Sequence, residues 1–240
     1  MEYGGLKMDK KYNIFMVYND KPSGMYDTLY KALDKSIKQN FPSANFIVEK
    51  NFSMNNPRYG KRVEDAMAYK WCEFAQKTTL PTIFIGCDLL VLRDFSEVFN
   101  DDFDLAVTIR DTKRDVLNNG VVFMKNTPEG KELMNEYAII MDKMQKDKKL
   151  HHKYNKLIPV DQAAMEHLWR LHPERIKAYP CNIYNITQEY YYEPLHKDAA
   201  VLHVKSELRK TIFDKNFINK RHPKMNKNHH LVKLWNSYNV

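Results

Sequence analysis

Residues Pro81–Arg110, PTIFIGCDLLVLRDFSEVFNDDFDLAVTIR, decide the fold. An apolar run, Thr82–Ile85, stops at Gly86-Cys87-Asp88, and a second run, Leu89–Leu92, stops at Arg93-Asp94. A carboxylate at the end of a buried strand is costly unless a cation meets it there. Ligands of open α/β sheets bind at strand ends. Asp88 is therefore the first candidate for a functional site.

Strand and helix patterns alternate along the rest of the chain. Strands are predicted over 12–18, 45–49, 81–85, 104–109 and 120–124. Helices are predicted over 25–39, 61–76 and 160–171, with a longer one that begins at Thr127-Pro128. Short strands are expected near Ile176 and Ile183 and over 199–204. This order predicts a three-layer α/β domain whose sheet is parallel in its N-terminal half and mixed later.

The composition fits one globular α/β domain. The chain has 240 residues, of which 43% are hydrophobic and 28% charged. Its cysteines, Cys72, Cys87 and Cys181, form no CxxC pair, so neither a zinc knuckle nor a disulfide framework is indicated. The N-terminus has no apolar signal-peptide core, and no apolar run is as long as a membrane span. We therefore expect a cytoplasmic protein without a transmembrane segment.

The charge is unevenly distributed along the chain. The formal net charge of +8 favours an anionic partner, such as a nucleotide, nucleic acid, acidic glycan or lipid surface. Residues 81–115 carry eight acids against four bases, so a divalent metal could sit in this acid-rich stretch. We expect a domain over 1–213 and a basic tail over 214–240. Because the tail contains Phe217, Trp235 and Tyr238, it suits nucleic acid or a membrane surface, or a docked helix with a solvated basic face.

Three later motifs accompany Gly86-Cys87-Asp88: Leu117–Phe123 (LNNGVVF), Pro159–Gln162 (PVDQ) and Ala199–His203 (AAVLH). In this order the set resembles the GT-A glycosyltransferases, most closely the glycogenin-like and lipopolysaccharide-galactosyltransferase-like retaining enzymes. The resemblance covers roughly residues 12–210. It implies a single GT-A domain with a mixed central sheet. It also implies sugar transfer from a nucleotide-sugar donor, most simply a UDP-sugar, to a glycan, protein, lipid or nucleic acid.

The resemblance implies a metal site. In this family an Asp-x-Asp motif and a histidine hold Mn²⁺ or Mg²⁺, which stabilises the departing nucleoside diphosphate. Asp88 and His203 take the metal-ligand roles by resemblance, whereas Gly86 replaces the first acid. Weaker metal affinity, a compensating acid elsewhere and lost activity are the open alternatives. Without the resemblance, Asp88 is a solvated turn acid and His203 a hydrogen-bonded residue of the core or sheet edge.

The residues with catalytic roles by resemblance are Asn119, Asp161 and Gln162. Asn119, flanked by donor-binding Asn118 and Gly120, would bind donor sugar hydroxyls. Asp161-Gln162 would contact the transferred sugar or the acceptor. Two local alternatives stay open: Asn-Gly is the strongest signal for a type I′ turn, and Asp161 suits a helix N-cap.

The remaining residues implied in donor binding lie along the whole domain. Strand ends and the metal motif supply Val17, Tyr18, Asn19 and Cys87, together with Arg110 for the pyrophosphate and Asp111 for the sugar. The second helix supplies Tyr69 and Lys70, and the C-terminal part supplies Lys205 and Lys210, which would neutralise the departing diphosphate. The alternatives are a core aromatic for Tyr18 and a solvated basic face for Lys210.

Gly86 also motivates a hypothesis from another class. A protein that binds nucleotide-sugars without turning them over would tolerate the loss of one metal-binding acid. A transferase that acts on nucleic acid, through the basic tail, is a further alternative. The leading interpretation is a metal-assisted glycosyltransferase.

Overall fold

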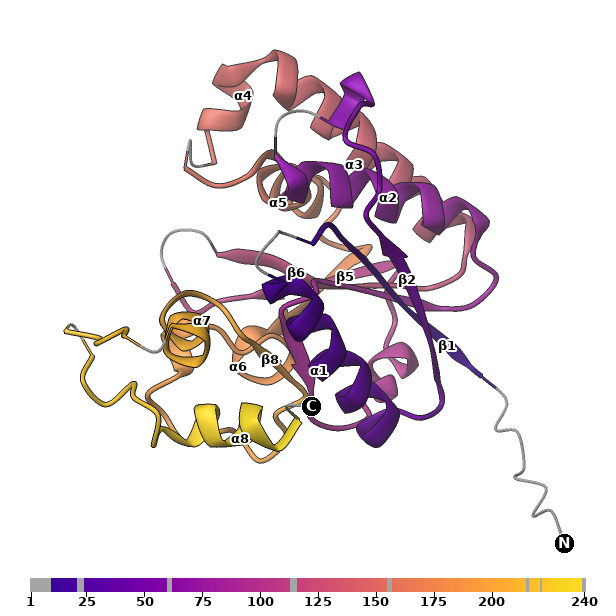
Figure 1. Cartoon of the computed structure of the whole chain (residues 1–240). Helices are drawn as coiled ribbons and strands as arrows, with labels where there is room; N and C mark the ends of the chain where they lie inside the picture. The colour runs from indigo at the N-terminus through magenta and orange to yellow at the C-terminus, as the bar shows by residue number, and fades with distance from the viewer. Residues whose placement is uncertain are drawn as a thin grey trace, which may run out of the picture.

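A six-stranded mixed sheet forms the centre of the molecule (Figure 1). The computed structural model describes residues 10–20, 24–59, 62–112, 116–154, 157–214, 216–220 and 222–238. The strand order is β2-β1-β3-β6-β5-β7. The strands are β1 (Tyr12–Tyr18), β2 (Ala44–Lys50), β3 (Thr82–Ile85), β5 (Leu105–Ile109), β6 (Leu117–Met124) and β7 (Ile176–Pro180). Strand β1 is parallel to both of its neighbours, β2 and β3. Strand β6 is antiparallel to its neighbours β3 and β5, and β7 is parallel to β5. The predicted mixed sheet is confirmed.

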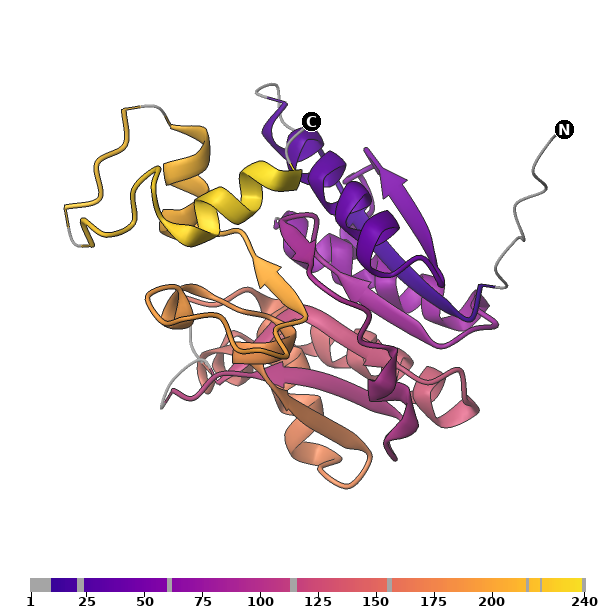
Figure 2. The same cartoon turned by 90° about the horizontal axis from the view of Figure 1, so that it is seen from below.

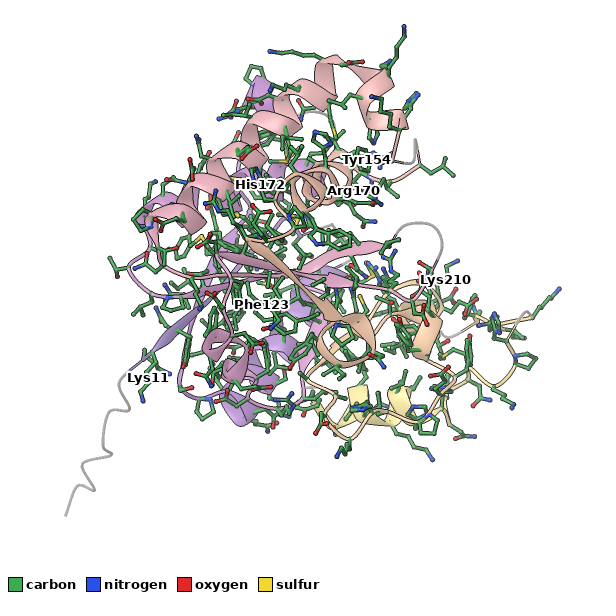
Figure 3. All side chains as sticks on the ribbon, turned by 180° about the vertical axis from the view of Figure 1, so that it is seen from behind. Lys11, Phe123, Tyr154, Arg170, His172 and Lys210 are labelled. Carbon is green, nitrogen blue, oxygen red and sulfur yellow. The ribbon has the colours of Figure 1, made fainter. Side chains whose placement is uncertain are left out.

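Helices cover both faces of the sheet (Figure 1). One layer contains α2 (Val63–Lys77), α3 (Pro128–Lys146), α4 (Lys148–His152) and α5 (Val160–Leu171), and the other contains α1 (Met25–Asn40) and α6 (Cys181–Tyr184). Three short 3₁₀ helices, η1 (Pro57–Tyr59), η2 (Ser96–Asn100) and η3 (Gln188–Tyr190), lie in the connections. Alternation along β1 supplies both cores, because Phe15 packs with the α2–α3 layer and Ile14 packs with α1. Figure 3 shows Phe123 within the sheet.

The N-terminus of α3 follows its sequence signals. Thr127 is the N-cap, and its Oγ1 accepts a hydrogen bond of 3.0 Å from the backbone N–H of Gly130. Pro128 occupies the first helical turn, where its missing N–H costs nothing. The predicted apolar face, including Leu133 and Tyr137, is fully buried. Asp94 likewise accepts from the backbone N–H of Ser96 at 2.8 Å, at the entry to η2.

A second, two-stranded sheet connects distant parts of the chain. In it β4 (Leu89–Val91) pairs antiparallel with β8 (Val201–His203), and Leu89 lies opposite His203. The backbone N–H of Val204 also donates to the carbonyl of Asp88 at 2.7 Å. The strand predicted near Ile183 is wrong: those residues form α6. The ladder of β7 ends at Pro180, which has no N–H to continue it, and the chain turns into one helical turn instead.

The C-terminal region packs on the same body. Two helices, α7 (Ser206–Phe213) and α8 (His230–Tyr238), follow β8, and α8 lies beside α1 (Figure 2). Trp235 is 1% exposed and packs its ring against Phe213, so it is not available to stack on a base or to enter a membrane interface. The Asn40 side-chain amide donates to the Tyr238 hydroxyl at 2.7 Å. The boundary between residues 213 and 214 stays a prediction.

No helix among the described residues combines the length and the apolar character that crossing a bilayer requires. Some predictions fall on residues outside those that the structure describes. The prediction about the N-terminus includes 1–9, that about the acid-rich stretch includes 113–115, and that about the basic tail includes 215 and 221. The cysteines predicted to form no framework are buried and are not joined to one another.

Candidate functional site

The strand order brings the predicted site residues to one edge of the sheet. The C-terminal ends of the parallel strands β1 and β3 meet the N-terminal end of β6 there, because Ile85 lies opposite Val121. The backbone N–H of Gly86 donates to the Gly120 carbonyl at 3.2 Å. Two cavities of about 230 and 280 Å³ open at this edge. Both are lined by Glu64, Met67, Gly86 and Asp88, so they form one continuous groove, which we call the edge groove.

A bulge in β6 shapes the middle of the edge groove. Val107 pairs with Val122, but the next residue, Thr108, pairs with Asn118. Residues 119–121 therefore have no partner of their own on β5, and such an insertion re-aims side chains at strand ends. Asn118, Asn119 and Gly120 all belong to β6, so the type I′ turn interpretation is wrong. Gly120 is required here, because a Cβ would lie 2.8 Å from Cε1 of His203.

Asp88 contacts two basic side chains. Its Oδ1 lies 3.2 Å from Nε2 of His203, and its Oδ2 lies 3.1 Å from Nη2 of Arg209. Burial alone would raise the pKa of the Asp88 carboxyl, but His203, Arg209 and the more distant Lys205 outweigh it and hold that pKa well below its usual range. Asp88 is therefore an ionised carboxylate, and the solvated-turn interpretation is wrong because only 17% of its side chain is exposed.

A chain of hydrogen bonds orients His203. Thr108 Oγ1 donates to the carbonyl of Asn118 at 2.7 Å and accepts from Asn185 Nδ2 at 2.8 Å. Asn185 Oδ1 is left to accept from His203 Nδ1 at 2.9 Å. This order of donors, assigned from the bonds, places a proton on Nδ1 and turns Nε2 toward Asp88. Burial lowers the pKa of His203, and neighbouring Asp88 opposes that effect.

Asp161 occupies the opposite end of the edge groove. Asn119 Nδ2 donates to Asp161 Oδ2 at 3.0 Å and to the Tyr137 hydroxyl at 2.9 Å. The backbone N–H of Asp161 donates to Asp65 Oδ1 at 2.9 Å. Burial, followed by the negative charge of Asp65, raises the pKa of Asp161 to about 7. Pro159 is the residue before the first turn of α5, so the interpretation of Asp161 as the helix N-cap is wrong.

One oxygen of Asp161 has no hydrogen-bond partner. Its Oδ1 is buried and unpaired among the described residues, and Asp161 lines the 280 Å³ cavity. A buried carboxylate oxygen without a donor is costly, and a ligand hydroxyl would supply that donor. This end of the edge groove can therefore accept a hydrogen bond from a polar ligand.

Most of the predicted residues line the edge groove. Those at the smaller cavity are Tyr18, Asn19, Cys87 and Asp88. Those at the larger cavity are Asn118, Asn119, Gly120, Asp161, Gln162, His203 and Lys205, together again with Asp88. The structure thus gathers residues from β1, β6, α5 and β8 at one place, while their roles stay predictions.

Tyr69 and Lys70 point away from the edge groove. The residues of α2 that line it share one helical face: Val63, Glu64, Met67, Ala68 and Trp71. The Tyr69 hydroxyl donates to Asp142 on α3 at 2.7 Å. The Lys70 ammonium pairs with Glu49 at 3.0 Å and with Glu73 at 3.1 Å. The same helix was identified correctly, but the wrong face of it was assigned to the donor.

Four other predicted donor residues lie outside the two cavities. Val17 is fully buried in the core. Arg110 directly follows β5, and its Nε lies 3.8 Å from Oε1 of Glu189. Asp111 is exposed, and its backbone N–H donates to the Tyr190 hydroxyl at 3.0 Å. Lys210 is exposed on α7 (Figure 3) and lies 5.6 Å from the centre of the Phe217 ring.

The sequence interpretation missed Arg209, Glu64 and Met67. Arg209 lines the smaller cavity and pairs with Asp88. Lys205 precedes the first turn of α7 and has an extended backbone, so helical spacing from it did not single out Arg209. Lys210, which was chosen instead, is one residue further and turns to another face.

The Mn²⁺ or Mg²⁺ prediction can be compared with the donor set. Asp88 and His203 converge as expected of two ligands. Among the described residues, however, no three His, Cys, Asp or Glu side chains are grouped so that they could hold a metal ion. The second Asp88 oxygen already faces Arg209. These side chains do not fit a protein-held divalent ion, and metal binding stays an untested prediction.

Comparison with solved structures identifies the fold. The glycosyltransferase GlyE of Streptococcus pneumoniae TIGR4 matches 96% of the chain with a TM-score of 0.64 at 14% identity. A glycosyltransferase involved in glycosylation of the major capsid of PBCV-1 matches 83% of the chain and 96% of its own length, with a TM-score of 0.59 at 13% identity. The galactosyltransferase LgtC matches 80% of the chain and 86% of its own length, with a TM-score of 0.51 at 12% identity. The fold is GT-A-like.

At these identities the GT-A-like fold is what the likeness shows. The chain spans 60% of the length of GlyE. No protein-family model matches the sequence, and no curated protein matches it. The edge groove lies where ligands bind in open α/β sheets, at the carboxyl ends of parallel strands.

Proposed function

We propose that this chain is a glycosyltransferase that moves a sugar from a nucleoside diphosphate sugar, most simply a UDP-sugar, to an acceptor hydroxyl. One observation carries the proposal. In a GT-A-like fold, a single groove runs from Tyr18 and Asn19 at the end of β1, past the Asp88–Arg209 pair, to Asp161 and Gln162 on α5. Its order of surfaces, aromatic, cationic and then hydroxyl-binding, matches the order of groups in such a donor.

The nucleoside would bind in the 230 Å³ cavity. Tyr26 supplies ring surface there, and Asn19 supplies a side-chain amide. Tyr18 also lines this cavity, but its side chain is buried and its ring stacks on Tyr30 in the core. The Asn19 Nδ2 donates to the Phe52 carbonyl at 3.2 Å, while its Oδ1 is buried without a partner among the described residues. That oxygen could accept from a ribose or base donor. The predicted base-and-ribose role of Asn19 is therefore retained in the proposal, whereas Tyr18 is the core aromatic of the alternative interpretation and Val17 is buried beside it.

The sugar would bind in the 280 Å³ cavity. Asn119 and Asp161 are held there by each other and by Tyr137, so their polar atoms are positioned before a ligand arrives. The unpaired Oδ1 of Asp161 would accept from a hydroxyl of the sugar or the acceptor. Gln162 lies beside it on the first turn of α5. These contacts would orient the sugar carbon toward the incoming acceptor oxygen.

The reaction needs the leaving diphosphate to be stabilised. When the sugar–phosphate bond breaks, its electron pair goes to the diphosphate oxygen, and nearby positive charge lowers the barrier. His203, Lys205 and Arg209 surround the region where the two cavities meet. The acceptor, whether glycan, protein, lipid or nucleic acid, and the cytoplasmic location stay predictions.

A binding protein without turnover is the second candidate. Gly86 favours it, because the position that would carry the first acid has no side chain. Both candidates predict binding of a nucleoside diphosphate, but they differ in what happens to a nucleotide-sugar. The discriminating quantity is the slow release of diphosphate when the donor is hydrolysed by water in place of an acceptor.

The test uses the full chain and two measurements. Isothermal titration with UDP, GDP, CDP and ADP, each with and without Mn²⁺, measures nucleotide binding. Incubation with UDP-glucose, UDP-galactose and UDP-N-acetylglucosamine, followed by quantification of free UDP, measures turnover. We expect micromolar UDP binding and UDP release above the protein-free rate. Release at the protein-free rate despite binding favours the binding protein, and absence of binding to all four nucleotides overturns both.

A further inference from the structure

Arg209 places a permanent cation against the carboxylate that the sequence assigned to a metal. Its Nη2 lies 3.1 Å from Asp88 Oδ2, and its side chain is 23% exposed. Arg209 Nε is buried and has no hydrogen-bond partner among the described residues. A guanidinium is planar and carries five N–H donors, so one bond to Asp88 leaves others for a second anion. The guanidinium therefore has donors left for phosphate oxygens in the edge groove.

Lys205 is a second cation of the edge groove. It lines the 280 Å³ cavity, whereas Arg209 lines the 230 Å³ cavity, and Asp88 lines both. A ligand that extends from Asn19 to Asp161 would therefore meet both cations. Lys205 has no ion-pair partner within 4.0 Å among the described residues, so its ammonium group has hydrogen-bond donors left for a phosphate oxygen.

Gly86 explains why this arrangement is stable. A Cβ at position 86 would lie 3.0 Å from Asp88 Oδ1, so any side chain there faces that carboxylate. A second acid at this position would place two negatively charged carboxylates together, and a divalent cation would be needed to neutralise them. With Gly86, one Arg209 already balances one Asp88, and Lys205 adds a net positive charge. The diphosphate of a nucleotide-sugar carries two negative charges.

We infer that Arg209 and Lys205 take the place of a divalent ion, so that this chain binds the diphosphate of its donor without metal. The inference rests on the proposed function and specifies its leaving-group site. Arg209 contacts a phosphate oxygen through the N–H groups that Asp88 does not use, and Asp88 holds the guanidinium in position. His203 is turned toward Asp88 by Asn185, and both His203 and Lys205 line the 280 Å³ cavity.

The experiment compares binding with and without metal. UDP and inorganic pyrophosphate are titrated into the full chain by calorimetry, first in EDTA and then in excess Mn²⁺. We expect the dissociation constant of UDP in EDTA to be within about threefold of that in Mn²⁺. Pyrophosphate, which lacks the nucleoside, should bind more weakly but with the same indifference to metal.

Variants locate the metal-free binding on Arg209. Arg209→Ala should weaken UDP binding in EDTA by about 10- to 100-fold, since charge-assisted hydrogen bonds are the strong ones. Arg209→Lys keeps the positive charge but loses the planar guanidinium group, so its UDP affinity should lie between those of the parent chain and Arg209→Ala. Lys233→Ala removes one exposed charge from α8 and serves as the matched control, with no change expected. Circular dichroism and thermal unfolding establish that each variant folds.

A double variant tests whether a metal-dependent site can be created in this chain. Gly86→Asp combined with Arg209→Ala supplies the second carboxylate and removes the cation. We expect it to bind Mn²⁺ alone, detected by electron paramagnetic resonance of free against bound Mn²⁺, and to bind UDP only when Mn²⁺ is present. The parent chain should leave the Mn²⁺ signal unchanged.

The outcomes separate this inference from the proposed function. UDP binding that needs Mn²⁺ in the parent chain, or that is unchanged in folded Arg209→Ala, overturns the metal-free site and leaves the glycosyltransferase proposal standing. Absence of binding to every nucleoside diphosphate overturns the proposed function and the inference with it. Metal-indifferent UDP binding that depends on Arg209 supports both.

Discussion

Asp88, where the two cavities meet, and Asp161, at one end of the edge groove, are two largely buried carboxylates whose pKa values are shifted in opposite directions. Both side chains are mostly shielded from water, which by itself raises the pKa of a carboxyl. Around Asp88 the charges of His203, Arg209 and Lys205 reverse that effect. Around Asp161 the nearest charge is another acid, Asp65, which adds to it.

The comparison shows that neighbouring charges, and not the extent of burial, determine the direction in which each pKa is shifted. Asp88 is ionised at every physiological pH and holds Arg209 in place. Asp161, with a pKa of about 7, changes protonation near neutrality and keeps one oxygen unpaired. Acids whose environments separate their pKa values in this way are typical of sites in which one group holds charge and the other exchanges protons.

Asp161→Asn gives the largest expected effect. Removing the ionisable group should lower donor turnover by about 1000-fold, on the order of 4 kcal/mol, while UDP binding changes little. In the parent chain, kcat/KM should rise with pH through about 7, because only the ionised Asp161 accepts a proton. UDP-release kinetics between pH 5 and 9 measure both effects. Asp198→Asn, at an exposed carboxylate, is the control.

The same variant should be more stable than the parent at alkaline pH. The folded pKa of Asp161 is raised, so its folded state holds a proton that the unfolded chain has lost, and stability falls as pH rises from about 4 to 7. Above pH 7 the neutral amide should therefore raise the melting temperature, by roughly 5 °C. A melting temperature that is unchanged or lower at pH 8 would contradict the raised pKa.

Asp88→Asn should have the next largest effect. Unlike Asp161→Asn at alkaline pH, it should make the folded chain less stable. It leaves Arg209 facing a neutral amide, and breaking a partly exposed pair of this kind should cost about 2–3 kcal/mol of unfolding free energy. Because the folded pKa of Asp88 is lowered, the contribution is present above about pH 4 and is lost as the pH falls further. Urea unfolding at pH 7 and pH 3 measures the difference. A gap between parent and variant that is no smaller at pH 3 than at pH 7 would count against this account.

Gly120→Ala should have the smallest effect. A methyl group there would lie 2.8 Å from Cε1 of His203 and must push the ring away from Asp88. We expect a roughly tenfold loss in UDP affinity and about 1–2 kcal/mol of destabilisation. Imidazole chemical shifts in the NMR spectrum report the ring's new environment. Unchanged His203 shifts and unchanged affinity would mean that the ring does not need this position.

Much of the scaffold could be predicted from local patterns. Apolar runs, such as Tyr12–Tyr18, and helical spacing, such as that of α3, identified the strands and helices because burial follows periodicity. The cap at Thr127 was predicted because it depends on the residue types next to one another. The helix near Ile183 was not predicted. Over four residues, a helical turn and a short strand have the same apolar pattern, so periodicity cannot distinguish them.

The site was predicted in part. Asp88, Asn119, Asp161 and His203 were chosen by resemblance, and the structure brings all of them to the edge groove. Tyr69 and Lys70 were assigned to it as well, although they lie on other faces of α2. Arg209 was missed because nothing local distinguishes it from Lys210. Only the pairing of β4 with β8 shows which of them meets Asp88.

The sequence by itself determined the mixed α/β architecture and the missing acid at Gly86, because periodicity and residue identity are local properties of a chain. Only the tertiary structure decided that Arg209 faces Asp88 and that Asp65 lies behind Asp161. A pKa depends on charges within a few ångströms, and those charges come from segments far apart in the chain. The opposite shifts of the two acids therefore belong to the fold and not to either motif.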